Sequence, residues 1–168
     1  MLLAALLLSL PVAAQEIILV RHAEKGTEPA GDVALSTDGT LRAKALADLL
    51  AKAPPVIILT SPARRTRETA APTAELAGVP AEAVPIPPGD LPAHVRATVE
   101  KLALLRPGEV ALVVGHGNTV PAILKALGGP GLPDMPECAY DRVLRWDVLE
   151  KSLRVQRYGV KSACPLAE

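Results

Sequence analysis

Short apolar runs alternate with longer amphipathic stretches along most of the chain. Three of the runs are rich in β-branched residues and almost uninterrupted, which is typical of strands buried in a parallel sheet. They are Glu16–Val20, Val56–Leu59 and Glu109–Val114. Between them, apolar residues recur three and four positions apart, which predicts helices with one buried face.

The ends of the predicted helices carry capping and stop signals. Ser36 or Thr37 can cap a helix that runs to about Ala53, where Pro54-Pro55 ends it. Asn118 can cap another helix that runs to Leu127. The other elements expected are helices over 62–76 and 92–106, a short strand over 84–86, and two strands over 142–149 and 153–157. This order predicts an α/β fold with three layers, in which helices cover both faces of a mainly parallel central sheet.

The first 14 residues, MLLAALLLSLPVAA, have a different composition. Twelve of them are apolar and none is charged, but the run is shorter than the roughly 20 residues that a membrane span needs. With small residues before Gln15, it predicts a signal peptide over 1–14, a single domain over 15–168 and an extracytoplasmic (periplasmic or secreted) protein without a membrane span in its mature form. The positively charged start that is typical of a signal peptide is missing, because residues 1–14 contain no Lys or Arg. A start further upstream, or an apolar terminal strand or helix, is therefore the alternative.

Overall charge and aromatic content limit the kinds of ligand to expect. The 18 Lys and Arg residues balance 18 Asp and Glu residues, and this argues against a nucleic-acid partner, which would favour a basic surplus. The aromatic residues are Trp146, Tyr140 and Tyr158, with no Phe. The core must therefore be aliphatic, and a ligand site built on aromatic stacking is not expected.

Polar residues follow each of the three predicted strands. The strands lead into Arg21-His22, Thr60–Arg67 and Gly115–Asn118, and ligands of such sheets bind at the carboxyl ends of the strands. Arginine binds phosphate oxygens with two parallel hydrogen bonds, and the free amides at a helix start favour anions. A neutral imidazole among such cations can attack phosphorus. The three segments therefore predict a site for a tetrahedral dianion.

The same three segments resemble the motifs of the histidine phosphatase superfamily, which includes phosphoglycerate mutases and acid phosphatases. Arg21-His22-Ala23-Glu24 resembles the RHG signature, with Ala23 in place of glycine. Thr60–Ala70, TSPARRTRETA, resembles the TSxxxRAxxTA helix, and Val114–Pro121 resembles the motif of the second histidine. The resemblance runs from Ile17 to about Tyr158 in the order of the family, and is closest to its compact phosphatases.

The resemblance implies a role for each matching residue. His22 would be the nucleophile that becomes phosphorylated, and His116 would donate to the phosphoryl group. The residues expected to bind the phosphate are Arg21, Arg65, His116, Gly117 and Asn118. Arg64 and Arg67 would lie on the surface, and no metal or other cofactor would be needed.

The implied function is hydrolysis of a phosphomonoester, either a small phosphoester or a phosphoprotein. The alternatives are a non-catalytic phosphate-binding or interaction module of the same fold, and a phosphomutase. Short loops favour hydrolysis over mutase activity, because they leave little enclosure to keep water from an intermediate. A zinc hydrolase or deaminase is a further alternative, because His22-Ala23-Glu24 is an H-x-E string. Its Cys pair is missing, and His94 would have to complete the ligands.

The general acid that would protonate the leaving oxygen stays open. Asp90 is one candidate, and its alternative interpretation is a turn residue in a Pro-Gly-Asp loop. Glu24 is the rival, unless it forms an ion pair with Lys25 or Arg21; the site could also lack an acid altogether.

Three further expectations concern residues outside these motifs. His94 is expected to be solvated, and Arg42 is expected on the wet side of its helix. Cys138 and Cys164 could form a disulfide in an oxidising compartment or remain two thiols.

Overall fold

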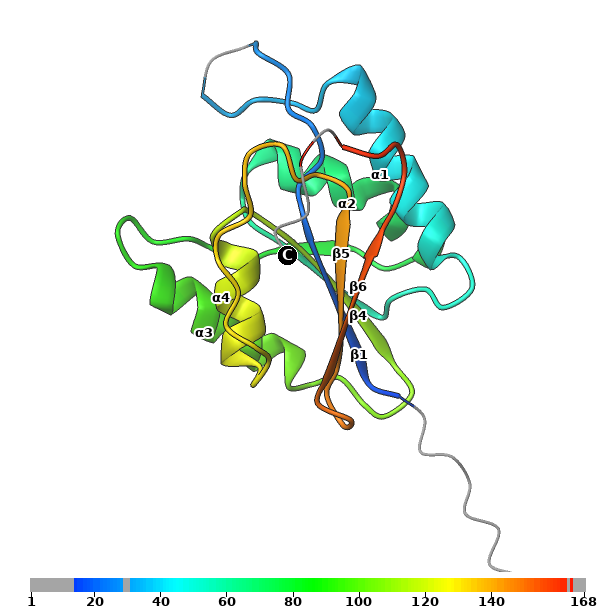
Figure 1. The fold of residues 1–168 in the computed structure, drawn as a ribbon, viewed down its shortest axis with the longest axis vertical. Coiled ribbons are helices and arrows are strands. Elements are labelled where there is room, and N and C mark those ends of the chain that lie inside the picture. Colours follow the sequence, from blue (N-terminus) through cyan, green and yellow to red (C-terminus); the bar gives the residue numbers. More distant parts are fainter. Residues whose placement is uncertain (1–13, 29–30, 163, 165–168) are drawn as a thin grey trace, which may run out of the picture.

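The computed structural model describes residues 14–28, 31–162 and 164, and these form a mixed six-stranded sheet flanked by four helices (Figure 1). The predicted leader lies almost wholly outside the described residues. The strands are β1 (Glu16–Arg21), β2 (Ile57–Thr60), β3 (Ala81–Ala83), β4 (Val110–Gly115), β5 (Arg142–Asp147) and β6 (Ser152–Arg157). The helices are α1 (Thr37–Leu50), α2 (Arg64–Ala77), α3 (Leu91–Leu102) and α4 (Thr119–Ala126). The predicted fold class is confirmed.

The sheet has a parallel part and an antiparallel edge. Its strand order is β3-β2-β4-β1-β5-β6. The first four strands in this order pair in parallel, whereas β5 and β6 form a hairpin that adds to β1 in the antiparallel sense. Both strands of this hairpin were predicted, and Lys151 lies in the turn that joins them. Lys151 has a positive φ of 49°, as expected in a tight turn.

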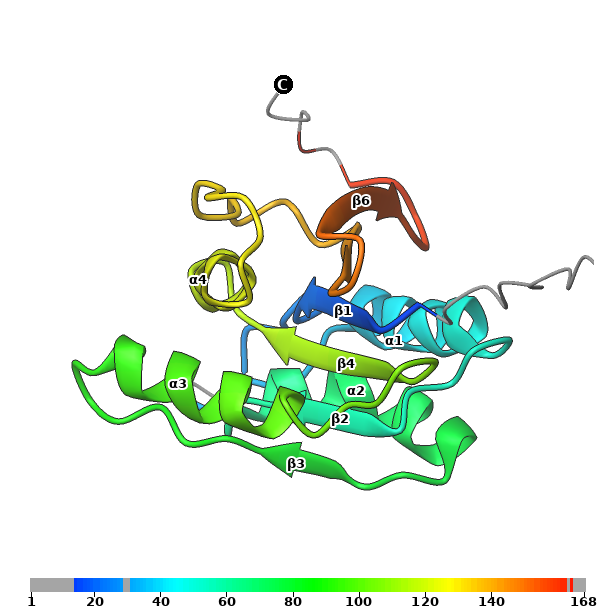
Figure 2. The same ribbon diagram turned by 90° about the horizontal axis from the view of Figure 1, so that it is seen from below.

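Alternate residues of the strands face opposite helix layers. Ile17 and Leu19 belong to one buried cluster with Ile123 of α4, whereas Ile18 and Val20 belong to the other cluster with Leu46 of α1. In Figure 2, α3 and α4 lie on one side of the sheet and α1 and α2 lie on the other. Because side chains on a strand alternate between its faces, each uninterrupted apolar run fills both cores at once.

Some details differ from the sequence-based prediction, including the end of α3, which lies at Leu102 rather than near 106. β3 comprises Ala81–Ala83 rather than residues 84–86. The amide of Val84 still donates to the carbonyl of Thr60 at 2.8 Å, but Pro85 has no N–H to extend the pairing. At α4, Asn118 occupies the N-cap position without a side-chain capping bond.

The predicted convergence of the strand ends follows from the strand order. β4 lies between β1 and β2, and the register pairs Arg21 with Gly115 and Thr60 with Val114. The three segments that carry the motifs therefore leave the sheet side by side. β5 runs antiparallel to β1, so the segment that precedes Arg142 reaches the same edge.

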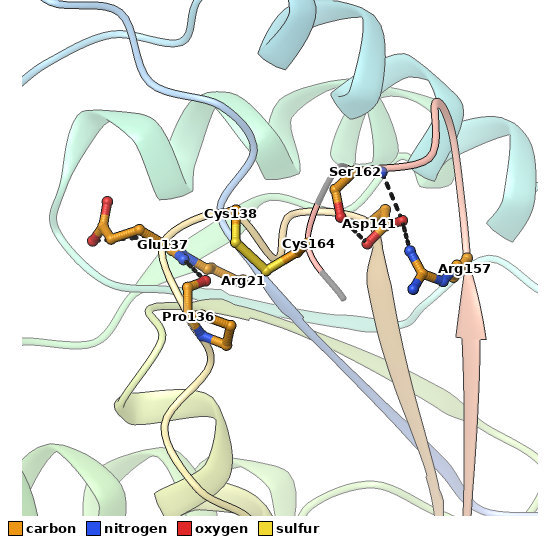
Figure 3. The surroundings of a disulfide bond; sticks show 8 residues. All are labelled: Arg21, Pro136, Glu137, Cys138, Asp141, Arg157, Ser162 and Cys164. Atoms are coloured by element: carbon orange, nitrogen blue, oxygen red, sulfur yellow. Dashed lines mark hydrogen bonds and ion pairs between the residues drawn. A yellow bond between two sulfur atoms is a disulfide. The ribbon is translucent and has the colours of Figure 1, made fainter. Parts of the chain in front are cut away.

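A disulfide joins that segment to the C-terminal part of the chain (Figure 3). Cys138 and Cys164 are bonded, with their Cα atoms 5.2 Å apart, and this decides between the two alternatives that the sequence left open. Nearby, the fully buried carboxylate of Asp141 accepts hydrogen bonds from Arg157 and from Ser162. Arg157, Ser162 and Cys164 are thus tied to the segment at the start of β5.

Within the described ranges, no helix combines the length and the apolar character that crossing a membrane requires.

Candidate active site

A polar cleft of about 420 Å³ opens at the edge where the parallel strands end. It is lined by Arg21, His22, Lys25, Arg65, His116, Gly117, Asn118, Asp134, Met135 and Glu137. All the residues that the sequence predicted to bind the phosphate lie among them, together with the predicted nucleophile. The structure thus brings these residues into one cleft.

His22 lies at the floor of this cleft, directly after β1. Its Nδ1 is 2.8 Å from the carbonyl oxygen of Ala23. A carbonyl can only accept, so Nδ1 carries a proton and Nε2 keeps its lone pair. Thr69 of α2 holds Ala23 in place by accepting a hydrogen bond from its amide at 2.9 Å. Burial, and after it the charges of Arg21 and Arg65, lower the pKa of His22 to about 4, so the imidazole is neutral at neutral pH.

His116 faces His22 across the cleft, with the two ring centroids 5.5 Å apart. Its Nε2 lies 2.8 Å from the hydroxyl of Ser61, and the guanidinium of Arg65 lies 3.4 Å from its Nδ1. Because an arginine can only donate, Nδ1 accepts in this arrangement and Nε2–H donates to Ser61. Burial, followed by the charge of Arg65, lowers the pKa of His116 to about 4.

Arg21 is almost fully buried and is held by the loop that precedes β5. It donates to the carbonyl of Pro136 at 2.5 Å and forms an ion pair with Glu137 at 3.2 Å. Its guanidinium also lies over the ring of Tyr140, 4.7 Å from the centroid. Its Nε is buried and has no hydrogen-bond partner within the described part of the chain.

The three arginines at the start of α2 divide as the resemblance implies. Arg65 is half-buried and lines the cleft. Arg64 pairs with Glu68 on the surface of the helix, and Arg67 pairs with Asp32 at 3.7 Å, with about half of each arginine side chain exposed.

Neither carboxylate considered as the general acid lines the cleft. Asp90 caps α3, and its side chain accepts from the amide of Ala93 at 2.9 Å. This geometry matches the alternative interpretation of Asp90 as a turn residue. Glu24 accepts two-pronged hydrogen bonds from Arg42 at 2.6–2.9 Å. Its ion-pair partner is thus Arg42, and the expected pairing with Lys25 or Arg21 is wrong.

Two side chains that were expected to be solvated are buried. Arg42 is 5% exposed because it bridges Glu24 and the carbonyl of Tyr158. His94 is 3% exposed, and its Nδ1 lies 3.0 Å from the carbonyl of Pro85. The buried side of α3 contains His94, Thr98 and Leu102, whereas the apolar residues Val95 and Val99 are only partly buried.

The structure adds site residues that the sequence analysis did not identify. They are Ser61, Lys25, Asp134, Glu137 and Tyr140. Ser61 stands inside the TSxxxRAxxTA-like segment, so its motif was the available signal. No pattern in the sequence signals Glu137 or Tyr140, because only the antiparallel addition of β5 brings their loop to the cleft.

The loop that contains Met135 can pass close to Gly117 because this residue has no side chain. A Cβ on Gly117 would lie 2.6 Å from the carbonyl oxygen of Met135, so no larger residue fits without moving the loop. The amide of Met135 donates to the carbonyl of Gly117 at 2.9 Å.

The described residues contain no group of three or more His, Cys, Asp or Glu side chains suited to holding a metal ion. The donor set of the cleft is instead arginine, lysine, imidazole and amide, which suits an oxyanion.

The fold and the cleft together define an α/β protein with two opposed neutral histidines and a pair of arginines at the carboxyl edge of its sheet. The sequence profile of the histidine phosphatase superfamily (branch 1) matches residues 17–86. This match includes His22 and Arg65 and covers a little under half of the chain, and it agrees with the superfamily that the three motifs resemble.

Solved structures of several phosphatases share the fold. A mycobacterial glucosyl-3-phosphoglycerate phosphatase in complex with inorganic phosphate is 21% identical, with a TM-score of 0.62 over 89% of this chain and 98% of that one. The putative phosphohistidine phosphatase SixA from Agrobacterium tumefaciens is 23% identical, with a TM-score of 0.59 over 88% and 99%. A protein histidine phosphatase SixA complexed with tungstate is 20% identical, with a TM-score of 0.62 over 85% and 95%.

No curated protein sequence matches the chain significantly. The family and the solved neighbours together support phosphatase activity.

Proposed function

We propose that the protein hydrolyses phosphomonoesters through a phosphohistidine intermediate on His22, without a metal ion. The observation that carries this proposal is the state of His22: a buried, neutral imidazole whose Nδ1–H is fixed to the carbonyl of Ala23. The free lone pair on Nε2 is the nucleophile that the first step needs.

In the first step, Arg21 and Arg65 bind the oxygens of the phosphoryl group. Nε2 of His22 attacks phosphorus, the P–N bond forms and the P–O ester bond breaks. The alcohol leaves with a proton from solvent, because the carboxylates that line the described cleft, Asp134 and Glu137, lie at its exposed rim. The charges of Arg21 and then of Lys25 lower the pKa of Glu137, so this carboxylate is ionised and is a poor acid.

In the second step, water attacks the phosphohistidine and the P–N bond breaks to release inorganic phosphate. His116 stabilises the transferring group by donating from Nδ1. The hydroxyl of Ser61 can either accept from Nε2 or donate to it, because a hydroxyl rotates. When Arg65 turns to the phosphoryl oxygens, Ser61 can therefore hold His116 in the tautomer that donates. In this tautomer His116 supplies the electrostatic stabilisation that a metal ion would otherwise bring.

The substrate class is a small phosphoester or a phosphorylated protein side chain. The solved neighbours support both, since they include a glucosyl-3-phosphoglycerate phosphatase and phosphohistidine phosphatases. At 20–23% identity these neighbours do not select one of the two.

We further propose that the protein works outside the cytoplasm. The apolar leader over 1–14 and the disulfide between Cys138 and Cys164 support this location, since disulfides persist in oxidising compartments. Sequencing the N-terminus of the protein from the periplasm or culture medium tests it. A mature N-terminus near Gln15 is expected, and material that begins at Met1 would contradict export by cleavage.

Hydrolysis of an aryl phosphate in the presence of a chelator tests the proposed function. The full-length protein should release phosphate, and H22A should lose this activity while keeping the same melting temperature within a few degrees. R65A should lose most of kcat/KM, whereas its surface counterpart R67A should not. Phosphate binding without turnover would indicate the non-catalytic module, and transfer of the phosphoryl group to a second alcohol without net hydrolysis would indicate a mutase.

A further inference from the structure

The rim of the cleft contains a carboxylate bound to the residue that should bind phosphate. Glu137 is 79% exposed, yet its carboxylate reaches back to Arg21 at 3.2 Å and lies 3.6 Å from the ammonium of Lys25. An anion at this position competes with the substrate for Arg21. Hydrolysis of a phosphomonoester by His22 does not by itself require a carboxylate at this position.

Three ties fix the loop that presents Glu137. The amide of Met135 donates to Gly117, and Arg21 donates to the carbonyl of Pro136. On the other side of Glu137, Cys138 is bonded to Cys164, as Figure 3 shows. The backbone of Glu137 is thus held on both sides, and the fold fixes the position of this residue at the mouth of the cleft.

The charges in the cleft are arranged in two tiers. The deeper tier holds Arg21 and Arg65, whose two positive charges match the two negative charges of a bound phosphoryl group. The outer tier holds two carboxylates, Asp134 and Glu137, against the single ammonium of Lys25. Once the phosphoryl group occupies the deeper tier, the mouth of the cleft carries a net negative charge.

The leaving group must occupy this mouth, because in-line attack by His22 directs it away from the floor. We propose that Glu137 is a specificity-determining residue that selects phosphomonoesters whose leaving group places an ammonium group beside the phosphoryl dianion. When the phosphoryl group binds Arg21, the ion pair between Arg21 and Glu137 breaks. The carboxylate of Glu137 is then free to pair with a cation on the leaving group. This inference rests on the proposed hydrolase function and names the substrate class of the same site.

Two sources can supply such an ester. One is a small aminoalkyl phosphate, and the other is a phosphorylated protein side chain followed by lysine. Both present a cation beside a phosphoryl dianion, and both lack the second anionic group that the rim would repel.

The test compares O-phosphoethanolamine with its near-isosteric neutral analogue, propyl phosphate, and with phosphoglycolate, which is anionic. The esters differ in leaving-group reactivity, so the readout is the change in their kcat/KM ratio between variants. E137Q should lower the ratio of phosphoethanolamine to propyl phosphate by up to about fivefold, the size expected for an exposed ion pair. E137K should lower it further and should favour phosphoglycolate.

E82Q is the matched control. Like Glu137, Glu82 is an exposed carboxylate that forms an ion pair with a lysine, in this case Lys101. Glu82 lies on β3 and does not line the cleft. This substitution should leave every ratio unchanged. The second arm uses phosphoserine peptides with Lys or Ala after the phosphoserine, and an effect of E137Q in either arm supports the inference and identifies the source.

Three outcomes would overturn it: equal ratios in wild type and E137Q in both arms, the same change in E82Q, or an equal rise in kcat/KM for all esters in E137Q. The last result would mean that Glu137 only competes for Arg21. Absence of hydrolysis for every ester, with inactive aryl phosphate as well, would instead reject the proposed function on which the inference rests.

Discussion

The Nδ1 atom of His22 lies 2.8 Å from the carbonyl oxygen of Ala23. This single contact defines the tautomer of the imidazole and leaves Nε2 as the reactive atom. Ala23, which provides the carbonyl, is in turn held by Thr69 through its amide N–H, so a residue of the second motif helps to orient the histidine of the first. The motifs are thus linked structurally as well as by their place at the sheet edge.

The low pKa values of the two cleft histidines predict an unusual titration. Burial and neighbouring arginines hold both near 4, whereas an unfolded histidine titrates near 6.5. NMR titration of the ring protons should show two resonances that change only around pH 4, and H22A and H116A should each remove one. Titration of both near pH 6.5 in the folded protein would contradict the description of a neutral pair.

The same shifts affect stability. Between pH 6.5 and 4 the unfolded chain takes up protons on His22 and His116 that the folded protein does not, so the free energy of unfolding should fall as the pH drops through this window. Urea unfolding at several pH values measures this, and H22A should flatten the dependence.

Ser61 should act as a positioning residue for His116. Because its hydroxyl contacts Nε2 at 2.8 Å, S61A should lower kcat about tenfold, the cost of a typical lost hydrogen bond, with a smaller change in KM. It should also move the titration of His116 observed by NMR. The control is T73V, which removes a buried hydroxyl of α2 that has no hydrogen-bond partner among the described residues. An unchanged kcat in S61A would exclude this role.

Asp90 should contribute to the stability of α3 rather than to proton transfer. Asparagine also caps helices well, so D90N should keep both stability and kcat, whereas D90A should lose about 1 kcal/mol of stability and keep kcat. Alkyl phosphates, whose alcohols are poor leaving groups, are the demanding substrates for this comparison. Loss of kcat in both variants on alkyl phosphates, with aryl phosphates unaffected, would instead identify Asp90 as the general acid.

The disulfide should stabilise both the fold and the loop at the cleft. Reduction, or the double substitution of Cys138 and Cys164 by serine, should lower the free energy of unfolding by about 3 kcal/mol. It should also raise KM, because Cys138 adjoins the residue paired with Arg21. Urea unfolding and steady-state kinetics measure the two effects. Alkylation of both cysteines in the unfolded protein before reduction would show that the bond is absent.

The sequence predicted those parts of the site that follow directly from strand ends. Arg21-His22, Arg65 and His116 all lie within a few residues of β1, β2 or β4, so the parallel order of these strands suffices to bring them together. The fold class was predictable for the same reason, since buried strands and amphipathic helices have distinct periods.

The parts that could not be predicted depend on contacts between distant segments. Glu137 reaches Arg21 only because β5 adds antiparallel to β1 and Cys164 holds its loop. The sequence predicts Arg42 as a surface residue of an amphipathic helix, because its partner Glu24 is 18 positions away and only the fold brings the two together. In each case a charge finds its partner through the tertiary fold, and local sequence does not encode this.

The most direct test of the central claim is to trap the intermediate. The protein is mixed with ³²P-labelled aryl phosphate, quenched during turnover and digested, and the labelled peptide is mapped. We expect phosphate that is labile in acid and stable in base, attached to the peptide that contains His22 and absent in H22A. Turnover at the wild-type rate with no label on this peptide, or with label that persists in H22A, would contradict it.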